Sequence, residues 1–155
     1  PDGSIGEDHK LETHLIPLVL REALFPEDRL KVFGTDYPTK DGSCIRDYIH
    51  VLDLADAHLQ ALRYLENGGV TDFFNLGTGI GSSVIEVINT AREVSDINIK
   101  YEKADRRAGD PPILVASAEK AKAVLGWVPE RSDLRTIISD AWTWHKSHPQ
   151  GFRDR

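Results

Sequence analysis

Short apolar, strand-like stretches alternate with longer amphipathic segments along this chain, and loops rich in glycine and proline separate them. The strand-like stretches are residues 30–33, 45–51, 73–76 and 97–101. Each either alternates apolar and polar side chains or forms a short apolar run, as strands do. Because helix-like segments lie between them, the pattern predicts an α/β fold with few short strands and several helices. With 155 residues and no internal repeat, the chain is expected to form one α/β unit.

The amphipathic segments have helix start and stop signals. Thr13 and Asp53 are expected to cap the helices that follow them, and Gly68 and Gly69 to end the second helix. One face of that second helix is predicted to hold Leu54, Ala57, His58, Ala61, Leu62 and Leu65. Further helices are predicted at residues 83–94, at 118–126 after a cap at Ser117, and at 133–146.

The bulk composition excludes several classes of protein. The net charge of −6 argues against a nucleic-acid surface, which needs clustered lysine and arginine, but it allows one small anionic ligand. No apolar run approaches the roughly 20 residues of a membrane span, and no signal-peptide pattern opens the chain. Cys44 is the sole cysteine, so no intrachain disulfide forms and a cytoplasmic location is expected. The chain begins at Pro1 and contains no methionine, which suggests a piece of a longer protein.

The turn Gly77-x-Gly79 lies between a strand-like stretch and a predicted helix, an arrangement that aims backbone N–H groups at a pyrophosphate. Further strand–helix units do not follow it, so a tight turn near a neighbour or a ligand is favoured over a complete NAD site. Short-chain-dehydrogenase chemistry also needs a tyrosine with a lysine four residues later, which lowers the pKa of the phenol. All four tyrosines lack this lysine: Tyr37, Tyr48, Tyr64 and Tyr101. We therefore expect no cofactor-binding and no catalytic residue in this chain.

Arg46, Arg107 and Asp110 are the polar residues from which a ligand site is predicted. Arg46 lies in an apolar stretch, where a buried guanidinium needs an anion: a carboxylate such as Asp47 or Asp53, or a ligand phosphate. Two arginines from distant loops can clamp a diphosphate, and a nearby carboxylate can accept hydrogen bonds from a sugar diol. The alternative, in which each arginine forms only a structural or solvated ion pair, stays open.

The histidines show no recognisable metal spacing. His145 and His148 are three residues apart near the end of the chain, and His50 and His58 have no histidine or cysteine partner nearby. No metal site is therefore expected. Cys44 has no adjacent histidine or lysine and is interpreted as an unreactive thiol.

Four segments, in this order, resemble the C-terminal half of UDP-glucose 4-epimerases: THLIPLVL, VFGTDYPTKDGSCIRDYIHVLDLADAH, FNLGTGIGSSV and RRAGDPP. The tail from EKAKAVLGW to AWTWHKSHPQGF continues the resemblance, which covers essentially the whole chain. It implies the C-terminal substrate-binding portion of an extended short-chain dehydrogenase/reductase fold. The NAD-binding Rossmann domain, with its catalytic Ser/Thr and Tyr–Lys pair, would be absent from residues 1–155. The implied reaction interconverts UDP-glucose and UDP-galactose through NAD-dependent oxidation and re-reduction at sugar C4, and this chain alone would be inactive.

Carried over residue by residue, the resemblance makes Arg46 and Arg107 ligands of the UDP diphosphate. Asp110 would contact the uridine ribose, and Phe33 would frame the uracil. The other residues that it assigns to the pocket, as framing, supporting or wall positions, are Lys31, Val32, Leu15, Val84 and Tyr48. The turn at Gly77 would then be a wall of the uridine site instead of a dinucleotide cradle.

Two positions depart from the family pattern. His14 stands where some epimerases have an asparagine that contacts phosphate, and an imidazole can still donate one hydrogen bond. Leu114 stands at the sugar-pocket gate, which is a bulky tyrosine in some members, and a smaller gate implies tolerance of UDP-N-acetylhexosamines. The expected partners are these sugars, UDP-glucose and UDP-galactose, in a full-length homodimer. Two alternatives stay open: the substrate half of a nucleotide-sugar dehydratase or decarboxylase, and a non-enzymatic UDP-binding module.

Overall fold

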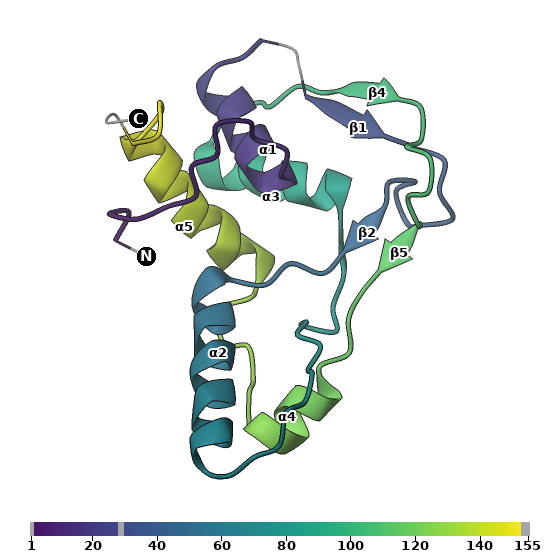
Figure 1. The fold of residues 1–155 in the computed structure, drawn as a ribbon. Helices are drawn as coiled ribbons and strands as arrows, with labels where there is room; N and C mark the ends of the chain where they lie inside the picture. The colour runs from purple at the N-terminus through teal and green to yellow at the C-terminus, as the bar shows by residue number, and fades with distance from the viewer. Residues whose placement is uncertain (1, 28–29, 153–155) are drawn as a thin grey trace.

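The computed structural model describes residues 2–27 and 30–152 (Figure 1). Its helices are α1 (Leu15–Leu24), α2 (Val51–Glu66), α3 (Val84–Ser95), α4 (Glu119–Leu125) and α5 (Leu134–Ser147). Figure 1 shows α1, α3 and α5 packed together in one half of the molecule, with α2 and α4 in the other. The prediction of an α/β fold with few short strands and several helices is confirmed. Within the described residues, none of the helices has the length and apolar character needed to cross a membrane.

The strands form two small sheets beside the helices. In the first, β1 (Lys31–Phe33) pairs in parallel with β4 (Glu102–Ala104). In the second, β2 (Ile45–Arg46) is central: it pairs antiparallel with β3 (Ser82–Ser83) and in parallel with β5 (Ile113–Leu114). Together the two sheets place the loop of residues 34–44 beside the loop of residues 105–112, although some 60 residues of other structure lie between them.

The main core lies among α1, α3 and α5. Its fully buried side chains include Val19, Leu20, Val87, Ile88 and Ile138. Their spacing puts one apolar stripe on each helix, and three such stripes facing one another exclude water. The start of α3 is fixed by a capping box, in which Ser83 accepts from the backbone N–H of Glu86 while the Glu86 carboxylate accepts from that of Ser83.

A second, smaller core joins α2 to α4. It consists of Ala57, Ala121 and Trp127, and the indole Nε1 of Trp127 donates to the backbone oxygen of Asp53 at 2.8 Å. The rest of the apolar face of α2 is not covered: Leu62 and Leu65 are each about half exposed, and Val51 is more exposed still. This half of the molecule therefore presents apolar surface to its surroundings.

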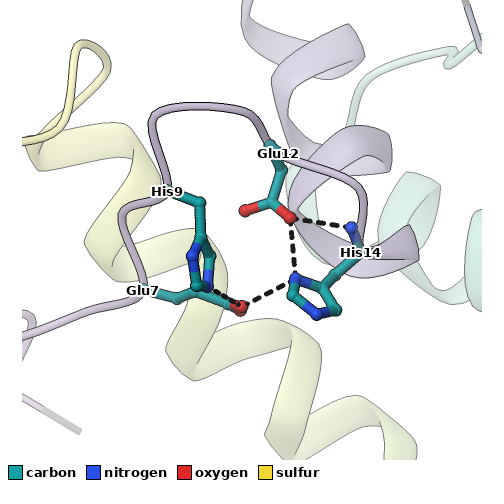
Figure 2. A group of neighbouring side chains, drawn as sticks. All are labelled: Glu7, His9, Glu12 and His14. Carbon is teal, nitrogen blue, oxygen red and sulfur yellow. Dashed lines mark hydrogen bonds and ion pairs between the residues drawn. The ribbon is translucent and has the colours of Figure 1, made fainter.

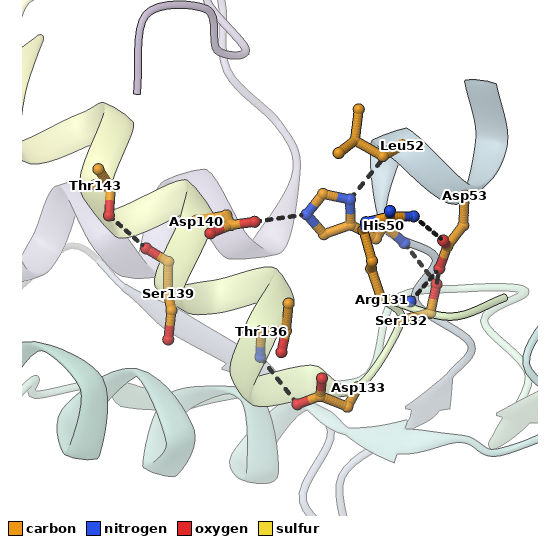
Figure 3. Close-up of polar contacts among 10 residues, drawn as sticks. All are labelled: His50, Leu52, Asp53, Arg131, Ser132, Asp133, Thr136, Ser139, Asp140 and Thr143. Carbon is orange, nitrogen blue, oxygen red and sulfur yellow. Dashed lines mark hydrogen bonds and ion pairs between the residues drawn. The ribbon is translucent and has the colours of Figure 1, made fainter. Parts of the chain in front are cut away.

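The junction between α2 and α5 is made by buried polar groups (Figure 3). His50 is the N-cap of α2: its Nδ1 accepts from the backbone N–H of Leu52 at 3.1 Å, while its Nε2 contacts Asp140 Oδ2 at 3.0 Å. Asp53 in the first turn accepts from Ser132 Oγ at 2.5 Å and from the backbone N–H of Arg131 at 2.9 Å. These bonds fix the entry of α2 relative to the start of α5.

Three of the predicted helix caps are wrong. His14, not Thr13, precedes α1, and its side chain makes no capping hydrogen bond. His50, not Asp53, caps α2, because the buried Asp53 carboxylate is used by the loop before α5. Ala118, not Ser117, precedes α4. The predicted stop of α2 is confirmed, since the helix ends at Glu66 and Gly68 follows with a φ of 86°.

The predicted strands are wrong in three places. Residues 73–76 have strand-like composition, but they pair with no strand among the described residues, and Phe73 is 84% exposed. Only Ile45 and Arg46 of the expected strand 45–51 are paired, because α2 already begins at Val51. The strand expected at residues 97–101 lies at Glu102–Ala104, where its backbone meets β1.

Candidate functional site

The principal cavity has a volume of about 610 Å³ and lies between the start of α1, β1, β2 and the loop of residues 105–112. Nine of the ten residues predicted to hold a uridine nucleotide line it. They are His14, Leu15, Lys31, Phe33, Arg46, Tyr48, Val84, Arg107 and Asp110. Val32, the tenth, is completely buried in β1 and does not reach the cavity through its side chain. The structure thus brings Arg46 and Arg107 together at one site, as expected for a clamp.

The Arg46 side chain, on β2, is held in one direction by three hydrogen bonds. Its Nη2 donates to Asp110 Oδ1 at 2.6 Å, and its Nη1 donates to the backbone oxygens of Ile45 and Pro111 at 2.7 and 3.0 Å. The anion that pairs with Arg46 is therefore the carboxylate of Asp110, and neither Asp47 nor Asp53 takes this role. The ion pair fixes the direction of the guanidinium, and the Arg46 side chain, which is 22% exposed, lines the cavity.

Arg107 differs from Arg46, because its guanidinium has no carboxylate partner among the described residues. Its Cζ lies 4.0 Å from the centroid of the Phe33 ring. Stacking on an aromatic face holds a guanidinium in place while leaving its N–H groups able to donate to another acceptor. Arg107 is thus positioned at the cavity wall with donors available for an anion.

The loop that carries Arg107 and Asp110 is tied to the loop of residues 34–44, which leads into β2. Arg106 Nε donates to Asp36 Oδ1 at 2.8 Å, and the Arg106 guanidinium lies 4.3 Å from the Tyr37 ring centroid. The Tyr37 hydroxyl donates to the backbone oxygen of Asp110 at 3.4 Å. The hydrogen bond from Arg106 lowers the pKa of the Asp36 carboxyl. These contacts, between residues about 70 positions apart, place Arg107 and Asp110 opposite β1.

Tyr48 lies at the inner wall of the cavity, packed against the main core. Burial raises the pKa of its phenol to about 12, because the phenolate would be poorly solvated there, and the nearby Arg46 charge opposes the effect only in part. Tyr48 therefore stays protonated at neutral pH and can support Arg46 without adding charge to the site.

The Gly77 turn does not line the principal cavity, so the prediction that it forms a wall of that site is wrong. The turn is held by Asp47, whose carboxylate accepts from the backbone N–H of Thr78 at 3.0 Å, the Thr78 hydroxyl at 2.6 Å and the Gly79 N–H at 3.2 Å. A Cβ on Gly77 would lie 2.7 Å from Asp47 Oδ2, which explains the glycine. Gly77, Thr78 and Gly79 instead line a separate cavity of about 550 Å³ next to Trp127.

The hydrogen bonds of Asp47 also decide whether the Gly77 turn could bind the pyrophosphate of NAD. The N–H groups that would cradle a pyrophosphate at Thr78 and Gly79 are already bound by a carboxylate, which would repel phosphate. The turn therefore does not fit a dinucleotide. Sequence reasoning missed the role of Asp47, which it treated only as an anion for the neighbouring Arg46, and it also missed that Cys44 and Arg21 line the principal cavity.

Leu114 lies outside the principal cavity. It is 60% exposed on β5, opposite Arg46 in the parallel register. Its side chain is thus available to contact a group that extends from the Arg46 end of the cavity.

The model of the NAD dependent epimerase/dehydratase family matches residues 3–77. The UDP-glucose 4-epimerase of Lacticaseibacillus casei is 52% identical over 155 residues, which are 100% of this chain and 47% of that protein. A crystal structure of a UDP-glucose 4-epimerase, 55% identical with a TM-score of 0.95, covers 99% of this chain, which in turn spans 47% of it. The Bifidobacterium longum enzyme in complex with NAD+ and UDP is 36% identical, with a TM-score of 0.86 over 97% of this chain and 44% of its own.

The chain spans about half the length of the curated relatives that it matches. The match is continuous from one end of this chain to the other and falls in the C-terminal part of the relatives. Over its whole length, this chain is therefore similar to the C-terminal part of UDP-glucose 4-epimerases, and residues 3–77 also match the model of the NAD dependent epimerase/dehydratase family.

Proposed function

We propose that this chain is the nucleotide-sugar-binding part of a cytoplasmic UDP-glucose 4-epimerase, an isomerase that interconverts UDP-glucose and UDP-galactose and is a homodimer at full length. The observation that carries this proposal is that Arg46, from β2, and Arg107, from the loop of residues 105–112, line one cavity of about 610 Å³. A cavity of this size suits a nucleotide. Its two guanidinium groups supply the cationic donors that a diphosphate requires.

The predicted residues that line the cavity share the work of holding the nucleotide. Arg107, stacked on Phe33, donates to one phosphate, and Arg46 donates to the other from its accessible edge. Asp110 keeps Arg46 oriented through Oδ1, and its carboxylate is the acceptor for the ribose hydroxyls. Phe33 also forms the apolar surface for the uracil ring, and the remaining lining residues exclude water from these hydrogen bonds.

The oxidation step belongs to another part of the enzyme in this proposal. Bound NAD would accept hydride from the sugar C4 and return it. The Gly77 turn does not fit that cofactor, since Asp47 occupies its N–H groups, and each tyrosine of the chain lacks the lysine of a catalytic pair. Residues 1–155 are therefore a nucleotide-sugar-binding region that is inactive by itself.

The exposed apolar surface of the half that contains α2 also supports the proposal that another part of the enzyme packs against this chain. Phe73 is 84% exposed in an unpaired extended segment, next in the chain to the half-covered helix α2. Contiguous exposed apolar surface is typical of a face that packs against another body. We accordingly expect the isolated chain to associate at high concentration, which analytical ultracentrifugation would detect.

Titration of the chain with UDP, followed by calorimetry, tests the binding site. Arg107→Ala removes charge-assisted hydrogen bonds worth about 1.5–3 kcal/mol each, so the Kd for UDP should rise at least about tenfold. Arg107→Lys keeps the charge but not the planar pair of donors, so its Kd for UDP should lie between those of the wild type and Arg107→Ala. Arg135→Ala is the matched control, because Arg135 is exposed on α5 and its side chain pairs, within residues 2–27 and 30–152, with Glu93 alone at 3.0 Å. Equal UDP affinity of the wild type and Arg107→Ala would remove Arg107 from the site.

A hybrid enzyme tests the reaction. The chain is joined to the N-terminal part of the Lacticaseibacillus casei enzyme, and the products formed from UDP-galactose are identified. UDP-glucose as product supports the epimerase, whereas a 4-keto-6-deoxy sugar would assign a dehydratase. A decarboxylase would be assigned by release of CO2 in a separate assay with a UDP-sugar that carries a C6 carboxylate. In the same hybrid, Leu114→Tyr should reduce turnover of UDP-N-acetylglucosamine while sparing UDP-glucose. Undetectable turnover of the N-acetylated sugar before the substitution would contradict the proposed role of Leu114.

A further inference from the structure

The loop before α1 brings together four potential metal ligands (Figure 2). They are Glu7, His9, Glu12 and His14, and one ligand atom from each lies within 4.8 Å of the others. Glu7 Oε1 lies 2.9 Å from His9 Nε2 and 3.0 Å from His14 Nδ1, and Glu12 Oε1 lies 2.8 Å from the same His14 Nδ1. Two carboxylate oxygens and two imidazole nitrogens thus converge on one small volume.

Contacts outside the cluster hold the loop in this shape. The backbone N–H groups of Thr13 and His14 both donate to Glu12 Oε1 at 2.7 Å. Burial would raise the pKa of the Glu12 carboxyl, but these hydrogen bonds outweigh it and lower the pKa below its ordinary value. At the other end of the loop, Trp144 Nε1 donates to the backbone oxygen of Glu7 at 3.2 Å, which fixes the loop on α5. The Glu12 carboxylate is therefore oriented by two backbone N–H groups as well as by the imidazole of His14.

The packing at Gly6 supports this anchoring. A Cβ at Gly6 would lie 2.0 Å from Trp144 Cγ, so only glycine lets the chain approach α5 this closely. The close approach sets the position of Glu7, the next residue. The four ligands thus belong to a segment that is held at Gly6 and at Glu12. The side chains of Glu7, His9 and His14 are exposed, whereas that of Glu12 is only 11% exposed.

The ligand set selects a class of metal ion. Two imidazoles with two carboxylates suit zinc and similar divalent transition metals, whereas magnesium and calcium prefer oxygen ligands throughout. Two carboxylates with neutral imidazoles carry a charge of about −2, which a divalent cation neutralises. Ligands at about 2.0–2.2 Å from tetrahedral zinc are separated by roughly 3.3–3.6 Å. The three contacts at 2.8–3.0 Å are close to this separation, so small side-chain rotations would open the space for an ion.

We propose that Glu7, His9, Glu12 and His14 form a binding site for one divalent transition-metal ion, with zinc the best match. The ion would take the place of the direct contacts between the imidazole nitrogens and the carboxylates and would join the loop to His14, the N-cap of α1. His14 and Leu15 also line the principal cavity, so the ion would stiffen one wall of that site. The proposal stands independently of UDP binding, because none of its evidence comes from the arginine clamp.

This group of two glutamates and two histidines could not be recognised from the spacing of the histidines alone. Histidines were compared only with other histidines and with cysteines, and His9 and His14 are separated by five positions in a loop. The missing signal was the alternation Glu7-x-His9-x-x-Glu12-x-His14, in which two glutamates complete the set. Only the loop conformation shows that all four side chains face one another.

The test is a titration of the untagged chain with Zn²⁺ by calorimetry, and with Co²⁺ by visible absorption, which is intense in tetrahedral sites. We expect one ion per chain. His9→Gln and His14→Gln should each weaken Zn²⁺ binding by more than about tenfold, since loss of a supporting group outside the ligand shell already costs 10–100-fold. The double variant should bind no ion at the site. His58→Gln is the matched control, because His58 is exposed on α2 and its ring makes one hydrogen bond in the described part of the chain, to the backbone oxygen of Leu54.

Circular dichroism of each variant establishes that it remains folded. Absence of Zn²⁺ binding by the folded wild type would overturn the proposal. So would binding that survives in the double variant at wild-type affinity, or binding that is lost in His148→Gln but not in His9→Gln, since either result would locate the ion elsewhere.

Discussion

Replacing Asp53 with alanine should destabilise the fold by about 2–4 kcal/mol. The Asp53 carboxylate is 1% exposed, and its Oδ2 accepts from Ser132 Oγ at 2.5 Å and from the Arg131 N–H at 2.9 Å (Figure 3). Each hydrogen bond to a charged group contributes about 1.5–3 kcal/mol, and a donor left unpaired in a buried site costs about 1–3 kcal/mol. Because Ser132 can rotate toward another acceptor, the expected loss of stability lies at the lower end of the sum of these contributions.

Urea unfolding monitored by tryptophan fluorescence measures this change, because Trp127 is buried beside the same turn of α2. Asp56→Ala is the matched control: Asp56 lies one turn further along α2, its side chain is 55% exposed, and its one ion pair among the described residues is with Arg131 at 3.6 Å. An exposed pair of this kind contributes about 0–1 kcal/mol. A free energy of unfolding for Asp53→Ala within 0.5 kcal/mol of the wild type, or equal to that of Asp56→Ala, would refute the reasoning.

The pH dependence of the same variant gives a second check. Burial raises the pKa of Asp53, but the hydrogen bonds from Ser132 and Arg131 outweigh it and hold the pKa below its ordinary value. A carboxylate with a lowered folded pKa stabilises the fold above its unfolded pKa of about 3.9, and this contribution is lost as the pH falls through the folded pKa. The difference in stability between wild type and Asp53→Ala should therefore be constant near neutrality and shrink only below about pH 4.

Two further predictions concern the loops and the cavity wall. Gly42→Ala should lower the stability by more than Gly109→Ala: both glycines have positive φ, at 82° and 79°, but only at Gly42 would a Cβ meet a neighbour, Thr35 O at 2.2 Å. Equal melting temperatures of the two variants would contradict this. Absorbance titration at alkaline pH should show one phenol ionising near pH 12, and Tyr48→Phe should abolish that step; its persistence in the variant would disprove the assignment.

Local features of the fold could be predicted from neighbouring residues. The start of α3 follows from Ser83 and Glu86, which are three positions apart and satisfy each other's backbone groups. The end of α2 follows from Gly68, which adopts the positive φ that a chain reversal requires. Nine of the residues that line the principal cavity were also predicted, but their roles came from the family resemblance, since the pattern alone left Arg46 and Arg107 as ion pairs or ligands.

Tertiary structure alone decided which distant groups meet. Nothing local selected Asp110, 64 positions away, as the partner of Arg46 over Asp47, which is adjacent. Residues 73–76 have the composition of a strand, but a strand exists only where another backbone supplies its hydrogen bonds, and the described part of the chain supplies none there. The four ligands of the loop before α1 converge for the same reason. Which charges and backbone groups pair depends on how helices and loops pack, and spacing along the chain does not encode that packing.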